Sequence, residues 1–266
     1  SYDIERDKYY YDATGQYFVD FQRETLPSDS VPDPMNMMEA SVALVGDNSF
    51  FGFVGPIRGG RYRLEVQQTW GTANYTTFVA DWRRYFSPTK NLTVGMRGLH
   101  YGRYGLSSEE SNKDGFGMLQ PLFLGYETLV RGYDYYSFTT DECQTSDPNA
   151  FSSCPAFDRL WGQRIGVATL ELRVPFIGVH EFGLINFPFL PTELVAFADA
   201  GAAWDADSPE TWTFSRTSGA RVPVFSTGLS ARFNILGVMV LECYYAYPFQ
   251  RPAKGWHWGF SLAPAW

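Results

Sequence analysis

The chain has 266 residues, of which 45% are hydrophobic and 18% aromatic, and its formal net charge is −8. The hydrophobic content excludes a disordered chain, and the negative charge argues against a nucleic-acid-binding protein, which needs basic patches. No run of about 18 apolar residues occurs, so the sequence predicts no transmembrane helix.

Alternation of apolar and polar residues dominates the sequence and predicts an all-β chain. In "GRYRLEVQQTW", for example, Tyr62, Leu64 and Val66 share one face, while Arg61 and Glu65 share the other. Many of the predicted strands are longer than the five or six residues that are usual in soluble sheets. About ten strands are expected, at 16–24, 38–46, 59–71, 74–86, 90–104, 161–178, 192–204, 222–235, 237–248 and 256–266.

The connections alternate in length along the chain, with long polar loops such as 105–160 and 205–221 and short turns such as 87–90 and 234–237. Long loops at one end and mostly short turns at the other are typical of a transmembrane antiparallel β-barrel of the bacterial outer membrane. This pattern places the C-terminus at the periplasmic end and the long loops outside the cell. A soluble β-sandwich is the alternative, but its strands would be shorter and its polar face would carry more Lys and Glu.

We expect two parts along the chain. Residues 1–37 form an N-terminal segment with one strand and a polar loop, and residues 38–266 form the barrel. Because no signal peptide opens the chain at "SYDIERDKYY", a mature product or a fragment is expected.

Cys143 and Cys154 enclose a polar loop, which favours an extracytoplasmic disulfide, with two unpaired thiols as the alternative. Cys243 lies alone in an apolar strand, where it is expected to act as a small hydrophobic residue.

Motifs for catalysis are missing from the sequence. There is no G-x-S-x-G and no H-E-x-x-H, and Ser261 near His257 is the one conceivable nucleophile–base pair. Both fall on the predicted lumenal face, whereas barrel lipases use the outer wall. The aspartates in 29–34 and 205–210 lack the spacing of a calcium loop. We therefore expect no enzyme, no metal and no cofactor.

Several motifs occur in a fixed order: "VRGY" at 130–133, "LELRVPF" at 170–176, "FADAGAAW" at 197–204, "GLSARFNI" at 228–235, "YYAYPF" at 244–249, and a terminal Trp266. In this order and spacing the chain resembles the BamA/TamA-type outer-membrane protein assembly superfamily, also called bacterial surface antigens. The resemblance covers at least residues 59–266. Complete members have sixteen strands and carry further N-terminal modules, so it implies that this chain is the C-terminal part of a longer barrel.

The resemblance also implies a site. In the family the loop that carries the V-R-G-Y tip (here Val130, Arg131, Gly132 and Tyr133) folds back into the lumen, where its arginine meets acidic residues on the inner wall. The acidic partners implied for Arg131 are Glu171 and Asp199. The alternation agrees, because it places both carboxylates on the polar faces of their strands. Without the resemblance, Arg131 would be interpreted as a solvated turn residue.

The last strand has two implied roles. The alternating aromatic residues Trp256, Trp258, Phe260 and Trp266 resemble the C-terminal signal that assembly machinery reads, and a plain hydrophobic last strand is the compatible alternative. In the family this strand also forms one side of a weak seam, to which glycines would contribute here.

The function that the resemblance implies is assistance in inserting or translocating proteins at the outer membrane. Its partners would be outer-membrane lipid and either unfolded outer-membrane proteins or accessory subunits of the envelope, with no nucleic acid. A passive pore, anchor or structural subunit of an envelope complex is the alternative.

Overall fold

The computed structural model describes residues 2–11, 17–26, 36–105, 119–143, 152, 154–179, 183–187, 189–206 and 212–264. The chain divides into two compact units, Ser1–Met37 and Met38–Trp266. The first unit contains a hairpin in which β1 (Tyr2–Tyr11) pairs antiparallel with β2 (Tyr17–Leu26). The sequence predicts only one strand here. Acidic and basic residues alternate through the centre of β1. Its sequence therefore lacks the alternation of apolar and polar residues from which strands are predicted.

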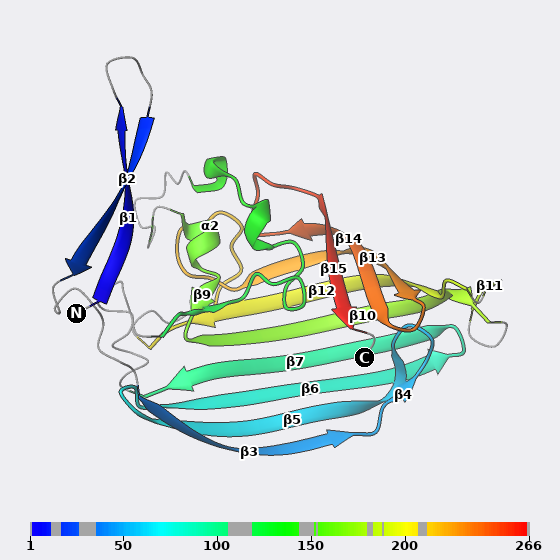
Figure 1. Cartoon of the computed structure of the whole chain (residues 1–266). Helices are drawn as coiled ribbons and strands as arrows, with labels where there is room; N and C mark the ends of the chain where they lie inside the picture. The colour runs from blue at the N-terminus through cyan, green and yellow to red at the C-terminus, as the bar shows by residue number, and fades with distance from the viewer. Residues whose placement is uncertain are drawn as a thin grey trace. The chain divides into compact units, whose positions relative to one another are not determined.

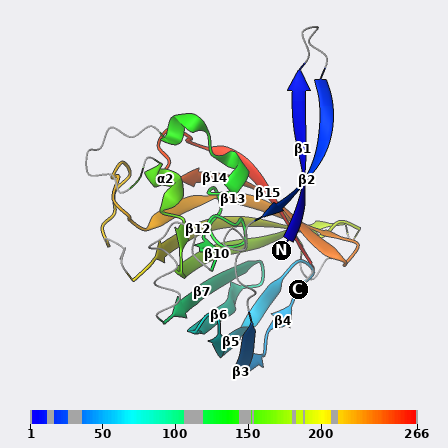
Figure 2. The ribbon, with the colours of Figure 1, turned by 60° about the vertical axis from the view of Figure 1, so that its left-hand side comes forward.

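The second unit contains a curved sheet of long strands in the order β15-β14-β13-β12-β10-β7-β6-β5-β3 (Figures 1 and 2). These strands are β3 (Met37–Asp47), β5 (Pro56–Gly71), β6 (Tyr75–Thr89), β7 (Leu92–Tyr104), β10 (Arg164–Gly178), β12 (Thr192–Trp204), β13 (Val224–Ile235), β14 (Met239–Pro248) and β15 (His257–Pro264). Each of the nine corresponds to a strand predicted from the alternation. The paired neighbours whose registers are defined, from β5 to β15, run antiparallel.

Four two-residue strands lie outside this order: β4 (Phe50–Phe51), β8 (Leu122–Phe123), β9 (Trp161–Gly162) and β11 (Ile185–Asn186). β8 pairs with β9, β4 pairs with β5, and β11 pairs with β10. β4, β8 and β11 are too short to show a period of two, which is why the sequence pattern does not predict them, whereas β9 lies at the start of the strand predicted at 161–178.

The sheet has two chemically different faces. Along β12 the odd-numbered residues Val195, Phe197 and Asp199 are buried, whereas Leu194 and Ala196 are exposed. The exposed face carries large apolar side chains on most strands, among them Trp82, Leu172, Leu229 and Trp258. A sheet whose polar side is buried and whose apolar side is exposed is the reverse of a soluble protein, and it is the arrangement of a membrane barrel wall.

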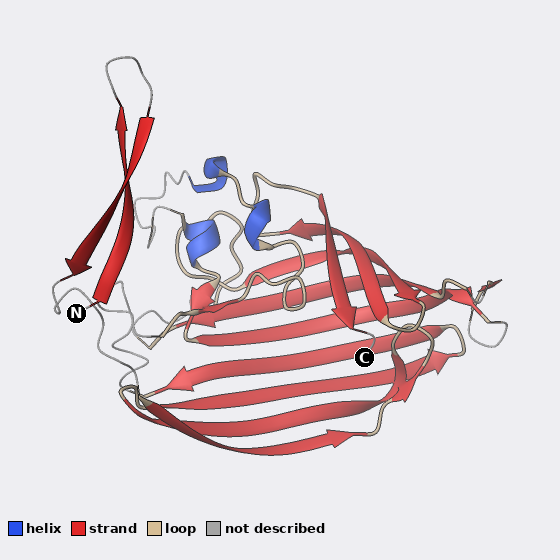
Figure 3. Ribbon diagram, in the orientation of Figure 1, coloured by secondary structure: helices blue, strands red, loops and turns tan. Residues whose placement is uncertain are grey.

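The described part of the connection between β7 and β10 lies on the concave side of the sheet (Figure 3). It contains two short 3-10 helices, η2 (Tyr135–Ser137) and η3 (Thr140–Cys143), and one short α-helix, α2 (Pro155–Asp158). Val130, Tyr133, Leu124 and Leu160 of this connection are fully buried and pack against the inner face of the sheet. The long loop is therefore part of the core.

Candidate functional site

Three strands bring carboxylates together on the inner face. Glu171 is on β10, Asp199 on β12 and Glu242 on β14, and each is on the buried side of its strand. The exposed fractions of their side chains are 6%, 1% and 15%. Three buried carboxylates this close together need cations close by, because desolvation of an unpaired charge is costly.

Arg131, at the tip of the long loop, supplies one such cation. Its Nε and Nη2 donate to the two oxygens of Asp199 at 2.8 Å each, and its backbone N–H donates to Asp199 at 3.2 Å. Nη1 lies 2.9 Å from Glu242 and 3.0 Å from Glu171. Below this fork, the guanidinium carbon lies 3.6 Å from the centre of the Phe197 ring. The structure thus brings together Arg131, Glu171 and Asp199, the three residues that the sequence analysis groups.

Two further arginines extend the network beyond the sequence prediction. Arg232 on β13 binds Glu171 at 2.6 Å and Glu242 at 3.0 Å, and Arg173 on β10 binds Glu171 at 2.6 Å. Arg173 shares the polar face with Glu171, so the alternation already pointed to it. Alternation also places Glu242 on the polar face of its strand, but only the pairing register shows that Glu242 and Arg232 lie directly opposite each other.

The other residues of the tip fix its backbone. Gly132 has a φ of +90°, which disfavours any other residue, and a Cβ there would lie only 3.3 Å from the Cβ of Ala246. The hydroxyl of Tyr133 lies 3.0 Å from the carbonyl oxygen of Phe225 and 3.0 Å from the Gln250 side-chain oxygen, and its one hydrogen is shared between these two acceptors. Burial raises the pKa of the Tyr133 phenol, so it remains a donor.

Val130 completes the tip by packing against the sheet. It is fully buried, and it lies so close to Gly201 on β12 that a Cβ at this glycine would come within 2.7 Å of it. All four residues of the V-R-G-Y tip are therefore in contact with the sheet or with the turn that follows β14.

Another arginine, outside the network around Glu171, binds the loop tip from the turn that follows β14. Arg251, in the turn between β14 and β15, is 1% exposed. It donates two hydrogen bonds to Glu142, at 2.7 and 2.8 Å, and one to the carbonyl of Gly132 at 2.8 Å. It also binds Ser137. The predicted strands at 237–248 and 256–266 leave this residue in a connection, and local sequence does not predict that Arg251 is buried against Glu142, 109 residues away.

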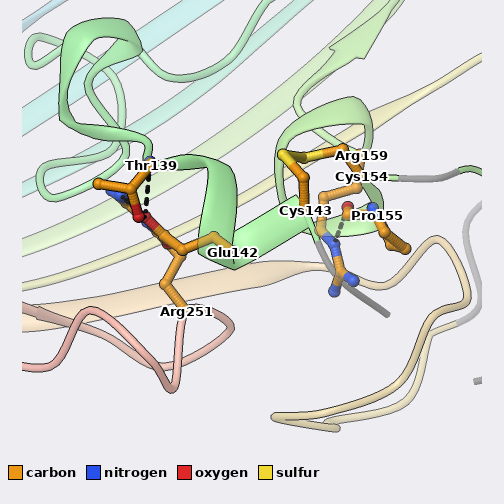
Figure 4. The surroundings of a disulfide bond; sticks show 7 residues. All are labelled: Thr139, Glu142, Cys143, Cys154, Pro155, Arg159 and Arg251. Atoms are coloured by element: carbon orange, nitrogen blue, oxygen red, sulfur yellow. Dashed lines mark hydrogen bonds and ion pairs between the residues drawn. A yellow bond between two sulfur atoms is a disulfide. The ribbon is translucent and has the colours of Figure 1, made fainter. Parts of the chain in front are cut away.

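A disulfide joins Cys143 and Cys154, immediately after Glu142 and immediately before Pro155 (Figure 4). The bond connects η3, which carries Glu142, to α2, where Arg159 donates to the carbonyl of Pro155 at 2.7 Å. Cys243 is a free thiol, half-buried on β14. The disulfide therefore stabilises the loop segment that positions Glu142 against Arg251.

The Glu142–Arg251 pair predicts a pH dependence of stability. Burial raises the pKa of the Glu142 carboxyl, but hydrogen bonds and charge from Arg251 outweigh this and hold the pKa below its usual value of 4.5. A depressed folded-state pKa contributes stability above the usual value, and this contribution is lost as the pH falls through the folded-state pKa. We expect Glu142→Gln to lower the free energy of unfolding at about pH 7 and to have much less effect at about pH 3. Urea unfolding of both proteins at the two pH values measures this, and an unchanged difference would contradict it.

The predicted signal residues of the last strand lie on its outer side. Trp256, Trp258 and Phe260 are exposed by 50%, 73% and 70%. Trp256 precedes β15, and its ring stacks on that of Tyr245 with centroids 5.1 Å apart. Trp266 lies outside the described residues.

Comparisons with known proteins agree with this architecture. The sequence profile of the Omp85 superfamily domain matches residues 2–263. The chain belongs to the Omp85 superfamily. Among solved structures it is similar to BamA from Haemophilus ducreyi lacking POTRA domains 1–3, with a TM-score of 0.56 and 15% sequence identity. The match covers 94% of this chain and 43% of that one, so the chain spans less than half the length of this solved relative. A comparison with curated proteins gives no match.

Membership assigns the chain to a superfamily of outer-membrane β-barrels of the protein-assembly type. In the part of the chain that the structure describes, no helix is long and apolar enough to cross a membrane. Among the same residues, no group of three His, Cys, Asp or Glu side chains could hold a metal ion. The buried ionic network connects the tip of the long loop to the inner face of the sheet.

Proposed function

We propose that this chain forms the C-terminal part of an outer-membrane barrel that assists the insertion or translocation of proteins, without catalysis. In this proposal the long loops face the outside of the cell and the C-terminus faces the periplasm. The partners are outer-membrane lipid, together with unfolded outer-membrane proteins or accessory envelope subunits.

The observation that carries the proposal is the contrast between a firmly fixed loop and a weakly held last strand. The loop tip is bound to β10, β12 and β14 through Arg131. β15 has eight residues, fewer than any other strand in the main order, and within the described residues it pairs only with β14. An edge strand presents unpaired backbone groups, which another strand can use.

The pairing of β15 is weakened further by its glycine. Gly259 lies opposite Tyr244, whose ring occupies the space where a side chain at Gly259 would be. The Tyr244 hydroxyl reaches past the strand to Asp134 of the loop at 3.2 Å. Gly259 itself contributes no side chain to the pairing of β15 with β14, and a glycine inside a strand weakens it, as expected of a strand that can separate.

Depletion of the protein in its bacterium tests the proposal. We expect the levels of folded outer-membrane proteins to fall, and to recover when the wild-type chain is restored. The variant Arg84→Gln changes a residue on the exposed face of β6 and serves as a control. It should restore the levels as well as the wild-type chain does. Unchanged levels after depletion would reject the assembly role and favour a passive pore or anchor.

A further inference from the structure

Two connections at one end of the sheet contain long uncharged segments. The connection from β10 to β12 contains "GLINFPFLPT" at 183–192, and the connection from β13 to β14 lies within "FNILGVMVL" at 233–241. The connection from β6 to β7 lies at the same end of the sheet, since the start of β7 pairs with β10 near its end, and it reads "SPTKN" at 87–91. Turns that face water are normally polar, so the first two need an explanation that the third does not.

The two uncharged turns are adjacent and their apolar side chains are exposed. The backbone N–H of Asn234 donates to the carbonyl of Pro191 at 2.9 Å, which joins one turn to the other. Phe189 is 79% exposed and Leu236 is 87% exposed. The apolar turn surface is defined by the exposed side chains of Leu184, Ile185, Phe187, Phe189, Leu236 and Val238. An exposed apolar patch of this kind marks a surface that contacts lipid or another protein.

The tip of the β13–β14 hairpin shows how unusual this surface is for a turn in water. Leu236 and Gly237 have φ values of +54° and +74°, and the N–H of Val238 donates to the carbonyl of Ile235 at 3.0 Å. Asn-Gly is the favoured sequence of two-residue turns with two positive φ values, because asparagine tolerates this conformation better than leucine does. The turn thus carries a large apolar side chain where neither the backbone nor water favours it. An apolar environment around the tip would favour leucine over asparagine.

The apolar turn surface continues the exposed apolar side of the sheet. Leu194, near the start of β12, and Met239, the first residue of β14, are exposed on that side. Between the turn and Leu194, the polar side chains of Thr192 and Glu193 are buried, each with 3% exposure. A protein-binding patch normally has a polar rim. Continuity with the apolar wall, without a polar border, therefore favours lipid over a protein partner.

We propose that the apolar turn surface inserts into the membrane at this end of the barrel, at the boundary between headgroups and acyl chains. Burial of apolar side chains at this boundary provides the attraction. The turn backbone suits the location, because the N–H groups of Gly237 and Phe187 donate within the protein, to the Asn234 side chain and to the carbonyl of Gly178, at 2.8 Å each. The inference rests on the outer-membrane location of the barrel and not on its role in assembly. In the proposed topology the leaflet is the periplasmic one.

Spin labels on the full chain in phosphatidylcholine vesicles test the proposal. Cys243→Ser removes the free thiol, Cys143 and Cys154 are joined in the disulfide, and one label is placed at a time. Leu236→Cys reports on the turn surface, Asn91→Cys on the polar turn at the same end, and Leu229→Cys on the exposed wall. Electron paramagnetic resonance compares collisions with oxygen, which concentrates in lipid, and with a water-soluble nickel chelate. We expect the ratio of oxygen to chelate accessibility at Leu236→Cys to be several-fold higher than at Asn91→Cys.

Phe189→Cys is the second variant if Leu236→Cys does not fold, as judged by heat-modifiable migration in gels, and the same ratio is expected there. A ratio as low as that at Asn91→Cys in both variants would overturn the proposal and leave the surface to a protein partner. The label at Leu229→Cys separates this failure from a failure of the membrane location. If it too is accessible to the chelate, the barrel wall is not in the bilayer, and both the location and the inference that rests on it are wrong.

Discussion

Arg131→Ala is expected to lower the free energy of unfolding by about 3–5 kcal/mol, which is the usual cost of removing one partner from a buried ion pair. The guanidinium is 5% exposed and contacts three carboxylates. Its loss would leave Asp199, whose side chain is 1% exposed, without its bidentate partner. Arg232 can still neutralise Glu171 and Glu242, but Arg131 is the one cation among the described residues that forms a salt bridge with Asp199. The measurement is urea unfolding of the protein in lipid or detergent, followed by tryptophan fluorescence and by the heat-modifiable gel shift.

Arg63→Ala is the matched control for this prediction. Arg63 is also an arginine on the inner face of a strand, but its side chain is 56% exposed and its partner is Glu65, two residues along β5. Solvent screens such a pair, and its loss should cost less than about 1 kcal/mol. If Arg131→Ala costs no more than Arg63→Ala, the lumenal network does not stabilise the loop.

Exchange of the two charges, Arg131→Glu with Asp199→Arg, is not expected to restore stability. In the wild type, Arg131 also binds Glu171 and Glu242, so a glutamate at this position would meet two like charges. A full recovery in the exchanged protein would show that the pair acts alone, without the other two carboxylates.

Some residues of this ionic network can be predicted from the sequence alone, and others cannot. Alternation identifies strands and the face on which each residue lies, because burial of one face imposes a period of two on every strand. It thus placed Glu171 and Asp199 correctly on the inner face. Alternation does not give the pairing register, and the register alone places Arg232 opposite Glu242.

The loop contacts were predictable only through the resemblance to a known family. "VRGY" is a short and common pattern, and nothing in its residues specifies a partner 68 positions away. The resemblance supplied Glu171 and Asp199 but not Arg251, Glu142 or Gln250, which hold the same tip from the turn after β14 and from η3. These contacts depend on how the loop packs in three dimensions, and local sequence carries no signal for that.

Arg251→Ala is expected to cost about 3–5 kcal/mol, because it leaves the nearly buried carboxylate of Glu142 unpaired and removes a donor from the Gly132 carbonyl. A double-mutant cycle with Glu142→Ala separates these effects. We expect a coupling free energy of about 1.5–3 kcal/mol for the charged pair, with the remaining cost assigned to Gly132, Ser137 and the packing of Arg251 on the Phe138 ring.

Lys254→Ala is the control in the same turn, since Lys254 donates one hydrogen bond to the carbonyl of Ser137 at 2.8 Å and carries the same charge. Its loss should cost about 1 kcal/mol. Proteolysis under native conditions adds a local measurement: the loop should be cleaved faster in Arg251→Ala than in the wild type or in Lys254→Ala, because detachment of the tip exposes it. Equal cleavage in all three proteins would mean that the tip is held by Arg131 and the inner wall alone, and that Arg251 stabilises only the turn in which it lies.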